Sequence, residues 1–269
     1  MTSQEEQAGP ARRLLHGKVV LVSGGTQGVG AGVARAVIRE GASVVVTGRR
    51  ADVGEQFVAD LGGGRGDAVF VACDVADVEQ VRGAFAEGQR AFGQIDCLVN
   101  SAGLTSRGTL VETTPELFDA HIAVNLRGPF FLMQEFVRAR LDAGLPGSIV
   151  NVISSSQHAG QPYLAPYVAA KAGLAGLTRN AAHAHRWNRI RVNGLNIGWT
   201  ATEGENDTQR TFHNAGDDWR ERAAETLPMG RLGNVDEIAD FVAFLLSDRS
   251  GVVTGSIIDW DQNVLGGLG

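Results

Sequence analysis

Residues 18–50 read KVVLVSGGTQGVGAGVARAVIREGASVVVTGRR. The run from Lys18 to Ser23 is short, apolar and next to glycine, which is typical of a buried parallel strand. A glycine-rich turn follows, and residues 31–40 then place apolar side chains at helical spacing until Gly41 provides a stop signal. A second apolar run covers residues 43–47. Strand, turn, helix and strand within about 30 residues predict a βαβ unit.

The same alternation of apolar runs and helical patterns continues along the rest of the chain. It predicts an α/β fold of one domain, a Rossmann-type doubly wound parallel sheet with helices on both faces. One long helical stretch is expected to be interrupted at Gly128-Pro129. We expect the further strands at 68–73, 95–100, 148–153, 190–197 and 256–260, and the further helices at 78–92, 116–140, 167–187 and 236–246.

Two segments without a regular pattern of apolar residues suggest how the chain is organised. Residues 1–16 begin with acidic residues and a proline and contain no signal-peptide pattern, so we expect a flexible tail. Residues 17–269 are expected to form the single folded domain. Residues 200–222 are polar and show no clear period, and a segment of this length is typical of a lid or of disorder. We expect a lid with short helices.

Composition narrows the class of protein. The chain has 269 residues and a net charge of -6, so it can bury a large core and has no basic surface for nucleic acid. No run approaches the roughly 20 apolar residues of a membrane helix. Cys73 and Cys97 lie in apolar runs without CxxC spacing, so we expect two buried thiols, no metal site and a cytoplasmic location.

The turn after the first strand reads SGGTQGVG at residues 23–30. Glycine lets the backbone approach a pyrophosphate, whose charge then meets free N–H groups at the start of a helix. A turn that serves only the fold is the alternative. Its position between a buried strand and a helix, in the first βα unit, favours a dinucleotide site.

Several motifs together resemble the short-chain dehydrogenase/reductase family. Gly24, Gly28 and Gly30 are similar to its TGxxxGxG fingerprint, with Ser23 in place of the usual threonine. The resemblance covers about residues 17–263. Its other landmarks are Asp74 after the third strand, Asn100-Ser101-Ala102-Gly103 after the fourth, Asn125, the YxxxK pair Tyr167 and Lys171, and Ser154 thirteen residues before that tyrosine.

The chemistry of an oxidoreductase explains the spacing of the catalytic residues. Residues four apart lie on one face of a helix, so we expect the Lys171 ammonium to lie beside Tyr167 and to lower its pKa for acid/base catalysis. Ser154 would hydrogen-bond the substrate oxygen, with its neighbours Ser155 and Ser156 as alternatives. The resemblance implies that Asn125 holds a water that links Lys171 to solvent.

A nicotinamide cofactor is implied by the resemblance, and the second strand suggests which one. Gly48 stands where an acid would bind the ribose of NAD, whereas Arg49 and Arg50 can bond a 2′-phosphate. We therefore predict NADP(H), with NAD(H) possible if both arginines are only solvated surface charges. The residues expected to bind the cofactor are Gly24, Thr26, Gln27, Gly28, Val29, Gly30, Arg49, Arg50, Asp74, Val75, Asn100, Ala102, Gly103, Tyr167, Lys171, Gly198, Thr200 and Thr202.

The substrate is predicted only as a class. Polar and aromatic residues near the catalytic motif favour a small carbonyl or secondary-alcohol compound such as a sugar, polyol or cyclic ketone, and they are Ser154, His158, Tyr163 and Trp199. A 3-oxoacyl thioester reductase and a catalytically silent nucleotide-binding regulator are the alternatives. The resemblance also implies a homotetramer or homodimer, formed through the helices expected at 116–140 and 167–187.

Overall fold

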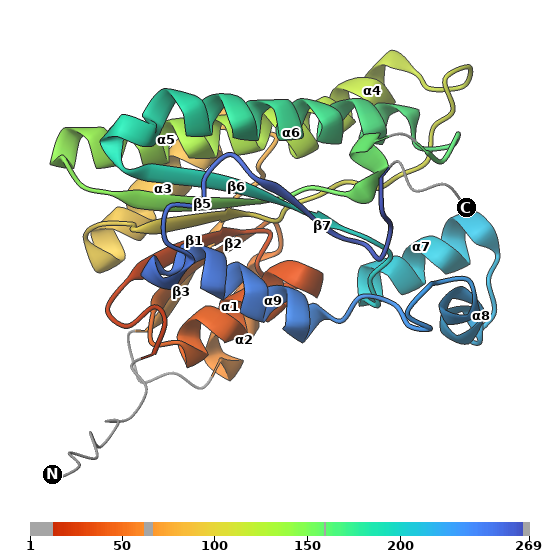
Figure 1. Ribbon diagram of the computed structural model, residues 1–269, viewed down its shortest axis with the longest axis horizontal. Helices are drawn as coiled ribbons and strands as arrows, with labels where there is room; N and C mark the ends of the chain where they lie inside the picture. The colour runs from red at the N-terminus through yellow and green to blue at the C-terminus, as the bar shows by residue number, and fades with distance from the viewer. Residues whose placement is uncertain (1–12, 62–66, 159, 266–269) are drawn as a thin grey trace, which may run out of the picture.

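A parallel sheet forms the centre of the molecule (Figure 1). The computed structural model describes residues 13–61, 67–158 and 160–265. Within these residues seven strands, all paired in parallel, follow the order β3-β2-β1-β4-β5-β6-β7. The strands are β1 (Val19–Ser23), β2 (Ser43–Gly48), β3 (Ala68–Ala72), β4 (Cys97–Asn100), β5 (Gly147–Val152), β6 (Ile190–Ile197) and β7 (Ile257–Trp260).

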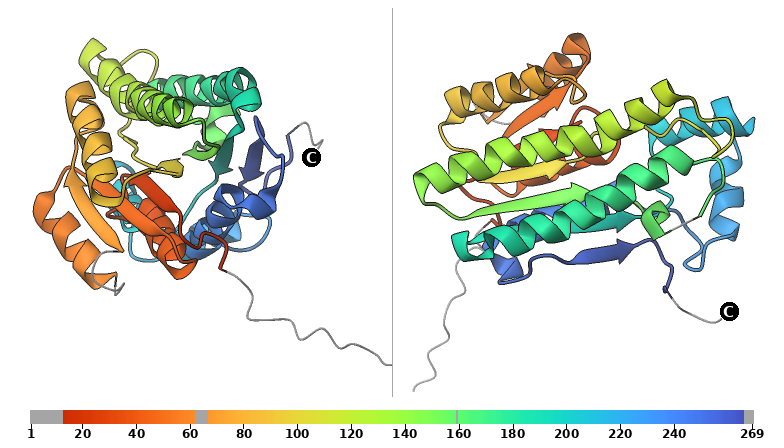
Figure 2. Two further views of the ribbon diagram at one scale, coloured as in Figure 1. Left: turned by 90° about the vertical axis from the view of Figure 1, so that its left-hand side faces the viewer. Right: turned by 90° about the horizontal axis from the view of Figure 1, so that it is seen from above.

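Helices cover both faces of the sheet, as the two further views show (Figure 2). One layer holds α1 (Gly28–Arg39), α2 (Ala51–Asp60) and α9 (Val235–Leu246), and its core includes Val20 and Val22 of β1. The other layer holds α3 (Val78–Phe92), α5 (Gly128–Ala143) and α6 (Ala165–His185), and its core includes Val19 and Leu21. Successive side chains of a strand point to opposite faces, so burial of both faces explains the continuous apolar runs.

The long helix before β5 is irregular, but not where the sequence suggests. It consists of α4 (Pro115–Ile122), a π-helical turn (Ala123–Arg127) and α5. The predicted break at Gly128-Pro129 is wrong, because proline is well tolerated in the first turn of α5. A Cβ atom on Gly128 would lie only 2.5 Å from the Val75 carbonyl oxygen, so glycine allows α5 to pack closely on the loop after β3.

The N-terminal boundary of the domain also differs from the prediction. Residues 1–12 of the predicted tail lie outside the described residues. Leu15 is fully buried, and the backbone N–H of Leu14 donates to Glu40 Oε2 at 2.9 Å. The packed domain therefore includes residues assigned to the tail, because Leu15 fills the end of the core beside α1.

The segment expected to be a lid contains two short helices, α7 (Glu203–His213) and α8 (Trp219–Glu225). They lie together beyond one end of the sheet, at the right of Figure 1. The hydroxyl of Thr202 caps α7 by accepting from the backbone N–H of Glu205 at 3.0 Å. In the described part of the chain, no helix is both long and apolar enough to cross a membrane.

Candidate active site

The carboxyl ends of the central strands gather the predicted site residues at one edge of the sheet. In open α/β sheets, this edge is where ligands bind. The glycine turn follows β1, Asn100 ends β4, Ser154 follows β5 and Gly198 follows β6. Tyr167 lies in the first turn of α6, the helix that packs over β6.

Three of the four predicted catalytic residues meet at the start of α6. Ser154 Oγ accepts from the backbone N–H of Ser156 at 3.2 Å, and the Ser154 hydroxyl lies near enough to Tyr167 to act on the pKa of its phenol. Lys171 Nζ lies 5.7 Å from the centroid of the Tyr167 ring and donates to the Val152 carbonyl at 2.8 Å. Of the three successive serines, Ser154 is the one that acts on the pKa of Tyr167.

Burial dominates the electrostatics of this group. It raises the pKa of Tyr167 to about 12, although the Ser154 hydroxyl and the Arg107 guanidinium act to lower that pKa and the Glu205 carboxylate raises it. Burial also lowers the pKa of Lys171 to about 8. The predicted lowering of the Tyr167 pKa is therefore wrong, because removing the phenol from water outweighs the groups that favour phenolate.

Asn125 lies in the π-helical turn and is fully buried. Its side chain pairs with the backbone of Leu104 in both directions, with N···O distances of 2.9 Å each way, and Nδ2 also lies 3.2 Å from His121 Nδ1. All the polar atoms of the side-chain amide thus have protein partners. A water held by this residue would therefore have to bind its backbone rather than its side chain.

His121 is a buried site residue that the sequence analysis missed. Its Nε2 atom lies 3.1 Å from both the carbonyl oxygen and the hydroxyl of Ser106, and its ring meets the Tyr167 ring edge-on at 6.2 Å. Burial lowers the pKa of His121. The available signal was its spacing, because a residue four positions before Asn125 shares its helix face.

The glycine turn has the shape that a dinucleotide pyrophosphate needs. Gly24 has φ +69, and a Cβ atom there would lie 2.6 Å from Ala102 Cα, so the turn packs directly on the segment after β4. Gly30 meets the turn equally closely, with its virtual Cβ 2.2 Å from the Gly24 carbonyl oxygen. Gly28 has φ +53 but faces open space, where a Cβ atom would only approach Thr202 at 3.6 Å. Within the described residues, no side chain caps the first N–H groups of α1.

The residues around this turn fit the same ligand. Gln27 is exposed and accepts at 2.6 Å from Arg50 Nη2, and Arg49 is also exposed. A Cβ atom on Gly48 would lie 3.2 Å from the side chain of Thr26, so the end of β2 is tightly packed and carries no acid. Val29 is buried in the first turn of α1.

The other predicted cofactor residues lie on neighbouring loops. Asn100 is buried and bonds Asn151 through Nδ2, whereas its Oδ1 has no hydrogen-bond partner among the described residues. Asp74 caps the turn after β3 by accepting from the backbone N–H of Ala76 at 3.0 Å. Val75 is buried, and a Cβ atom on Gly103 would lie 3.6 Å from Asn125 Oδ1. The remaining residues lie in the segment between β6 and α7, and they are Gly198, Thr200 and Thr202.

The predicted substrate residues do not form one cluster. Trp199 stacks on Trp219 with centroids 5.9 Å apart and donates from Nε1 to Glu205 at 2.8 Å. Tyr163 lies on a different loop, beside Arg107. His158 points to the ends of β6 and β7 instead, with Nε2 3.3 Å from Asp259 Oδ1. Arg107 and Glu205, which both influence Tyr167, were missed because neither belongs to a motif.

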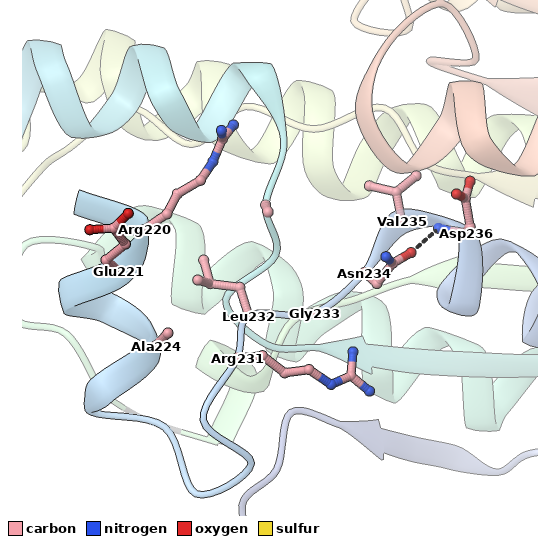
Figure 3. A pocket seen from close by; sticks show the side chains of 10 residues that line it. Arg220, Glu221, Ala224, Arg231, Leu232, Gly233, Asn234, Val235 and Asp236 are labelled. Carbon is pink, nitrogen blue, oxygen red and sulfur yellow. Dashed lines mark hydrogen bonds between the residues drawn. The ribbon is translucent and has the colours of Figure 1, made fainter. Parts of the chain in front are cut away.

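A cavity of about 500 Å³ lies between α8 and the segment that leads into α9 (Figure 3). Leu232 and Asn234 line one wall, and Arg220 and Ala224 of α8 line the other. None of the four predicted catalytic residues lines this cavity.

The two cysteines are both buried, as predicted. Burial raises the pKa of the Cys73 thiol and of the Cys97 thiol to about 12, so both remain protonated at neutral pH.

Known proteins resemble this chain over nearly its whole length. The family model described as enoyl-(acyl carrier protein) reductase matches residues 24–263. D-threitol dehydrogenase from Mycolicibacterium smegmatis is 34% identical over 257 residues, which cover 95% of this chain and 96% of that protein. NADP-dependent (R)-specific alcohol dehydrogenase from Lentilactobacillus kefiri is 34% identical over 245 residues, covering 90% and 94% respectively.

A solved structure agrees with these relatives. It comes from Sinorhizobium meliloti 1021 and is provisionally assigned as a short-chain alcohol dehydrogenase. It superposes with a TM-score of 0.85 at 32% identity, and the match covers 96% of this chain and 100% of that chain.

Proposed function

Since the chain belongs to the short-chain dehydrogenase/reductase family, and is an oxidoreductase that acts on alcohol groups, we propose that Tyr167 is its acid/base and that its substrate is a small polyhydroxylated alcohol or sugar. The observation that carries the proposal is that Ser154 and Lys171 both lie beside Tyr167, with Lys171 one helical turn further along α6. This group lies at the same edge of the sheet as the glycine turn.

The nicotinamide cofactor supplies the hydride acceptor or donor when it is bound. In the direction of reduction, Tyr167 gives its phenolic proton to the carbonyl oxygen, and in oxidation it takes the hydroxyl proton. The Ser154 hydroxyl donates a hydrogen bond to the same oxygen as charge develops there. Lys171, held by the Val152 carbonyl, returns the proton to Tyr167. Asn125 holds the backbone of Leu104, in the segment after β4, through its side-chain amide.

The choice of substrate class rests on the side chains around Tyr167 and on the relatives. Glu205 accepts hydrogen bonds from Trp199 and Gln209 and acts on the Tyr167 hydroxyl electrostatically. A half-buried carboxylate next to an indole is suited to bind substrate hydroxyl groups. Threitol dehydrogenase, a relative over 95% of the chain, acts on a polyol. A 3-oxoacyl thioester reductase is the second candidate, because a 3-oxoacyl-(acyl-carrier-protein) reductase from Thermotoga maritima is 34% identical over 93% of this chain.

The preferred cofactor in this proposal is NADP(H). Arg49 and Arg50 are exposed at the end of β2, and Gly48 places no carboxylate there. Two guanidinium groups would bind a 2′-phosphate, whereas an acid would repel it. The relative from Lentilactobacillus kefiri is named as NADP-dependent. A dissociation constant for NADPH larger than that for NADH would contradict this preference.

We also propose that the enzyme is a cytoplasmic homotetramer or homodimer. Its two free cysteines suit a reducing compartment. The long helices α5 and α6 lie side by side on one face and offer a surface for association (Figure 2). Size-exclusion chromatography with light scattering that shows only monomer would contradict the association.

The first test is nicotinamide absorbance during turnover. Wild type and Tyr167→Phe are compared with both cofactor pairs against sugars, polyols, cyclic ketones and 3-oxoacyl thioesters. We expect turnover of a polyol or sugar by wild type and a loss of at least about 1,000-fold in Tyr167→Phe. Cofactor affinity should persist in the variant, which controls for folding. Wild-type turnover by Tyr167→Phe would refute the assignment, and tight cofactor binding without any turnover would favour a regulator.

A further inference from the structure

Arg107 lies next to the catalytic helix although it is far from Tyr167 in the sequence. Gly108 pairs with the start of α6, since its N–H donates to the Tyr163 carbonyl at 2.8 Å and its carbonyl accepts from Ala165 at 3.0 Å. On the other side of Arg107, Ser106 contacts His121, whose ring meets that of Tyr167. The segment that carries Arg107 therefore runs along the wall of the proposed substrate site.

The guanidinium of Arg107 is held by groups from three segments. Its carbon lies 5.2 Å from the Tyr163 ring centroid and 5.6 Å from that of Phe212 in α7. Nε and Nη2 lie 3.3 and 3.0 Å from His213 Nε2, and Nη1 donates to the Thr105 carbonyl at 2.8 Å. These contacts fix the plane of the guanidinium between a loop and the lid.

The charge of Arg107 has no counter-ion in the part of the chain that the structure describes. No carboxylate there lies within 4.0 Å of it, although Arg210 of the same lid is paired with Asp217 at 2.9 Å. A guanidinium has five N–H donors, and the bonds to His213 and Thr105 use three. One N–H on each terminal nitrogen is left, which is the fork that binds a carboxylate or phosphate.

We propose that Arg107 binds an anionic group of the substrate, a carboxylate or a phosphate, while the hydroxyl-bearing carbon lies at Tyr167. This inference rests on the proposed function, since it names the substrate class for that same site. A guanidinium whose described hydrogen bonds go to a ring nitrogen and a carbonyl oxygen, with no carboxylate beside it, can pair with an anion in the site. The influence of the Arg107 guanidinium on Tyr167 supports their proximity. Glu205, on the lid, is then left to bind the hydroxyl groups of the same molecule.

The alternative use of Arg107 is purely structural. Its contacts with Phe212 and His213 also tie the lid to the loop after β4, so loss of the side chain would loosen the site for every substrate. The two uses differ in one measurable quantity. An anion subsite changes the ratio of affinities between charged and neutral ligands, whereas a structural tie changes both affinities together.

The experiment measures binding without turnover. In the Tyr167→Phe background with oxidised cofactor bound, D-threitol, D-threonate and D-threitol 4-phosphate are titrated. Intrinsic fluorescence, to which Trp199 and Trp219 contribute two of the four tryptophans, reports binding. The ratio of dissociation constants, neutral over anionic, is compared in Arg107→Gln, Arg107→Lys and the unsubstituted background. Arg210→Gln is the matched control, because it removes the same charge from the lid at a position paired with Asp217.

We expect at least one anion to bind roughly 30-fold more tightly than D-threitol. Arg107→Gln should remove most of that preference, Arg107→Lys should keep part of it and Arg210→Gln should keep all of it. The tighter of the two anions identifies carboxylate or phosphate. Binding of neither anion above D-threitol, or an unchanged ratio in Arg107→Gln, overturns the proposal. Tyr167-dependent turnover of a neutral polyol would persist in that case, so the proposed function would stand separately.

Discussion

The Nδ1 atom of His121 lies 3.2 Å from Nδ2 of Asn125 in the same helix. An amide nitrogen can only donate, so Nδ1 must be the unprotonated acceptor of the ring. The proton is therefore on Nε2, which donates to the Ser106 carbonyl at 3.1 Å. The ring is thus fixed as one neutral tautomer that joins the π-helical turn to the segment after β4.

We expect His121 to make the stability of the protein sensitive to acid. Its pKa in the folded state is lowered from 6.5, so its contribution to stability is present above pH 6.5 and is lost as the pH falls through the folded pKa. His121→Gln should flatten the decline of Tm between pH 7 and pH 5. His183→Gln, at an exposed position of α6, is the control. Parallel Tm profiles for wild type and His121→Gln would contradict this role.

Replacement of Lys171 by methionine should separate stability from catalysis. Burial lowers the pKa of Lys171 from 10.5 to about 8, so below pH 8 the fold must hold a charge that water would stabilise better. Lys171→Met should raise the free energy of unfolding at pH 7 by roughly 1–2 kcal/mol, after the loss of the bond to Val152 is subtracted.

The pH dependence provides the check on that variant. The cost of the buried ammonium disappears between pH 8 and pH 10.5, so the advantage of Lys171→Met should shrink over that range. Denaturant unfolding at pH 7 and pH 10 measures it, and turnover should be lost throughout. An advantage that grows with pH would show that the ammonium is not the source.

Alanine at Ser154 should lower kcat by roughly 100- to 1,000-fold, because the variant loses the donor that meets the developing charge. Ser154 acts on the pKa of Tyr167, whereas the neighbouring Ser155 does not. Ser155→Ala is therefore the matched control and should keep wild-type kcat. Steady-state kinetics of the two variants decide between the positions, and the reverse pattern would shift the catalytic role by one residue.

Two glycines of the first turn should respond differently to alanine. Gly28 faces open space, so Gly28→Ala should fold, with a cost of about 1–2 kcal/mol in stability for its φ of +53. The variant should fail to bind cofactor, because its methyl group would enter the space proposed for the pyrophosphate. Gly30→Ala should be severely destabilised, because its methyl group would lie 2.2 Å from the Gly24 carbonyl oxygen. Thermal unfolding and cofactor titration test both. Wild-type cofactor affinity in Gly28→Ala would argue against a pyrophosphate at this turn.

Loss of Arg49 and Arg50 should alter cofactor choice rather than cofactor binding in general. The double variant Arg49→Gln/Arg50→Gln should weaken NADPH by roughly 10- to 100-fold and leave NADH nearly unchanged, because only the former carries a 2′-phosphate. Arg90→Gln, on α3 and paired with Glu87, is the control. Fluorescence titration measures the dissociation constants for NADPH and NADH. An equal loss of affinity for both cofactors would point to a general effect of charge.

The sequence predicts those elements whose signals are local. The strand at 190–197 is predicted without error, and it lies between β5 and β7 with most of its residues buried. The α2 helix (Ala51–Asp60) has no predicted counterpart, since only two of its residues are buried. Its packing depends on Gly54, whose virtual Cβ would overlap the Phe70 ring of β3.

The residues of the candidate site also differ in whether a local sequence signal predicts them. Tyr167 and Lys171 are found from their YxxxK spacing together with the other family motifs, and a single helix brings them together. The contact between Arg107 and His213 joins residues 106 positions apart, and no local pattern relates them. The error over the Tyr167 pKa has a similar origin. The sequence shows the neighbouring charge on Lys171, whereas the removal of water from the phenol depends on every segment packed around it.

The π-helical turn at Ala123–Arg127 also limits how this gene can change in length. A π turn contains one residue more than the α-helix around it requires. Deletion of one codon there would restore regular pairing but rotate α4 against α5 by about 100°. Either His121 and Asn125 would leave the site, or the core side chains of α5 would leave the sheet. Substitutions in the turn can therefore accumulate during evolution where a single-residue deletion cannot.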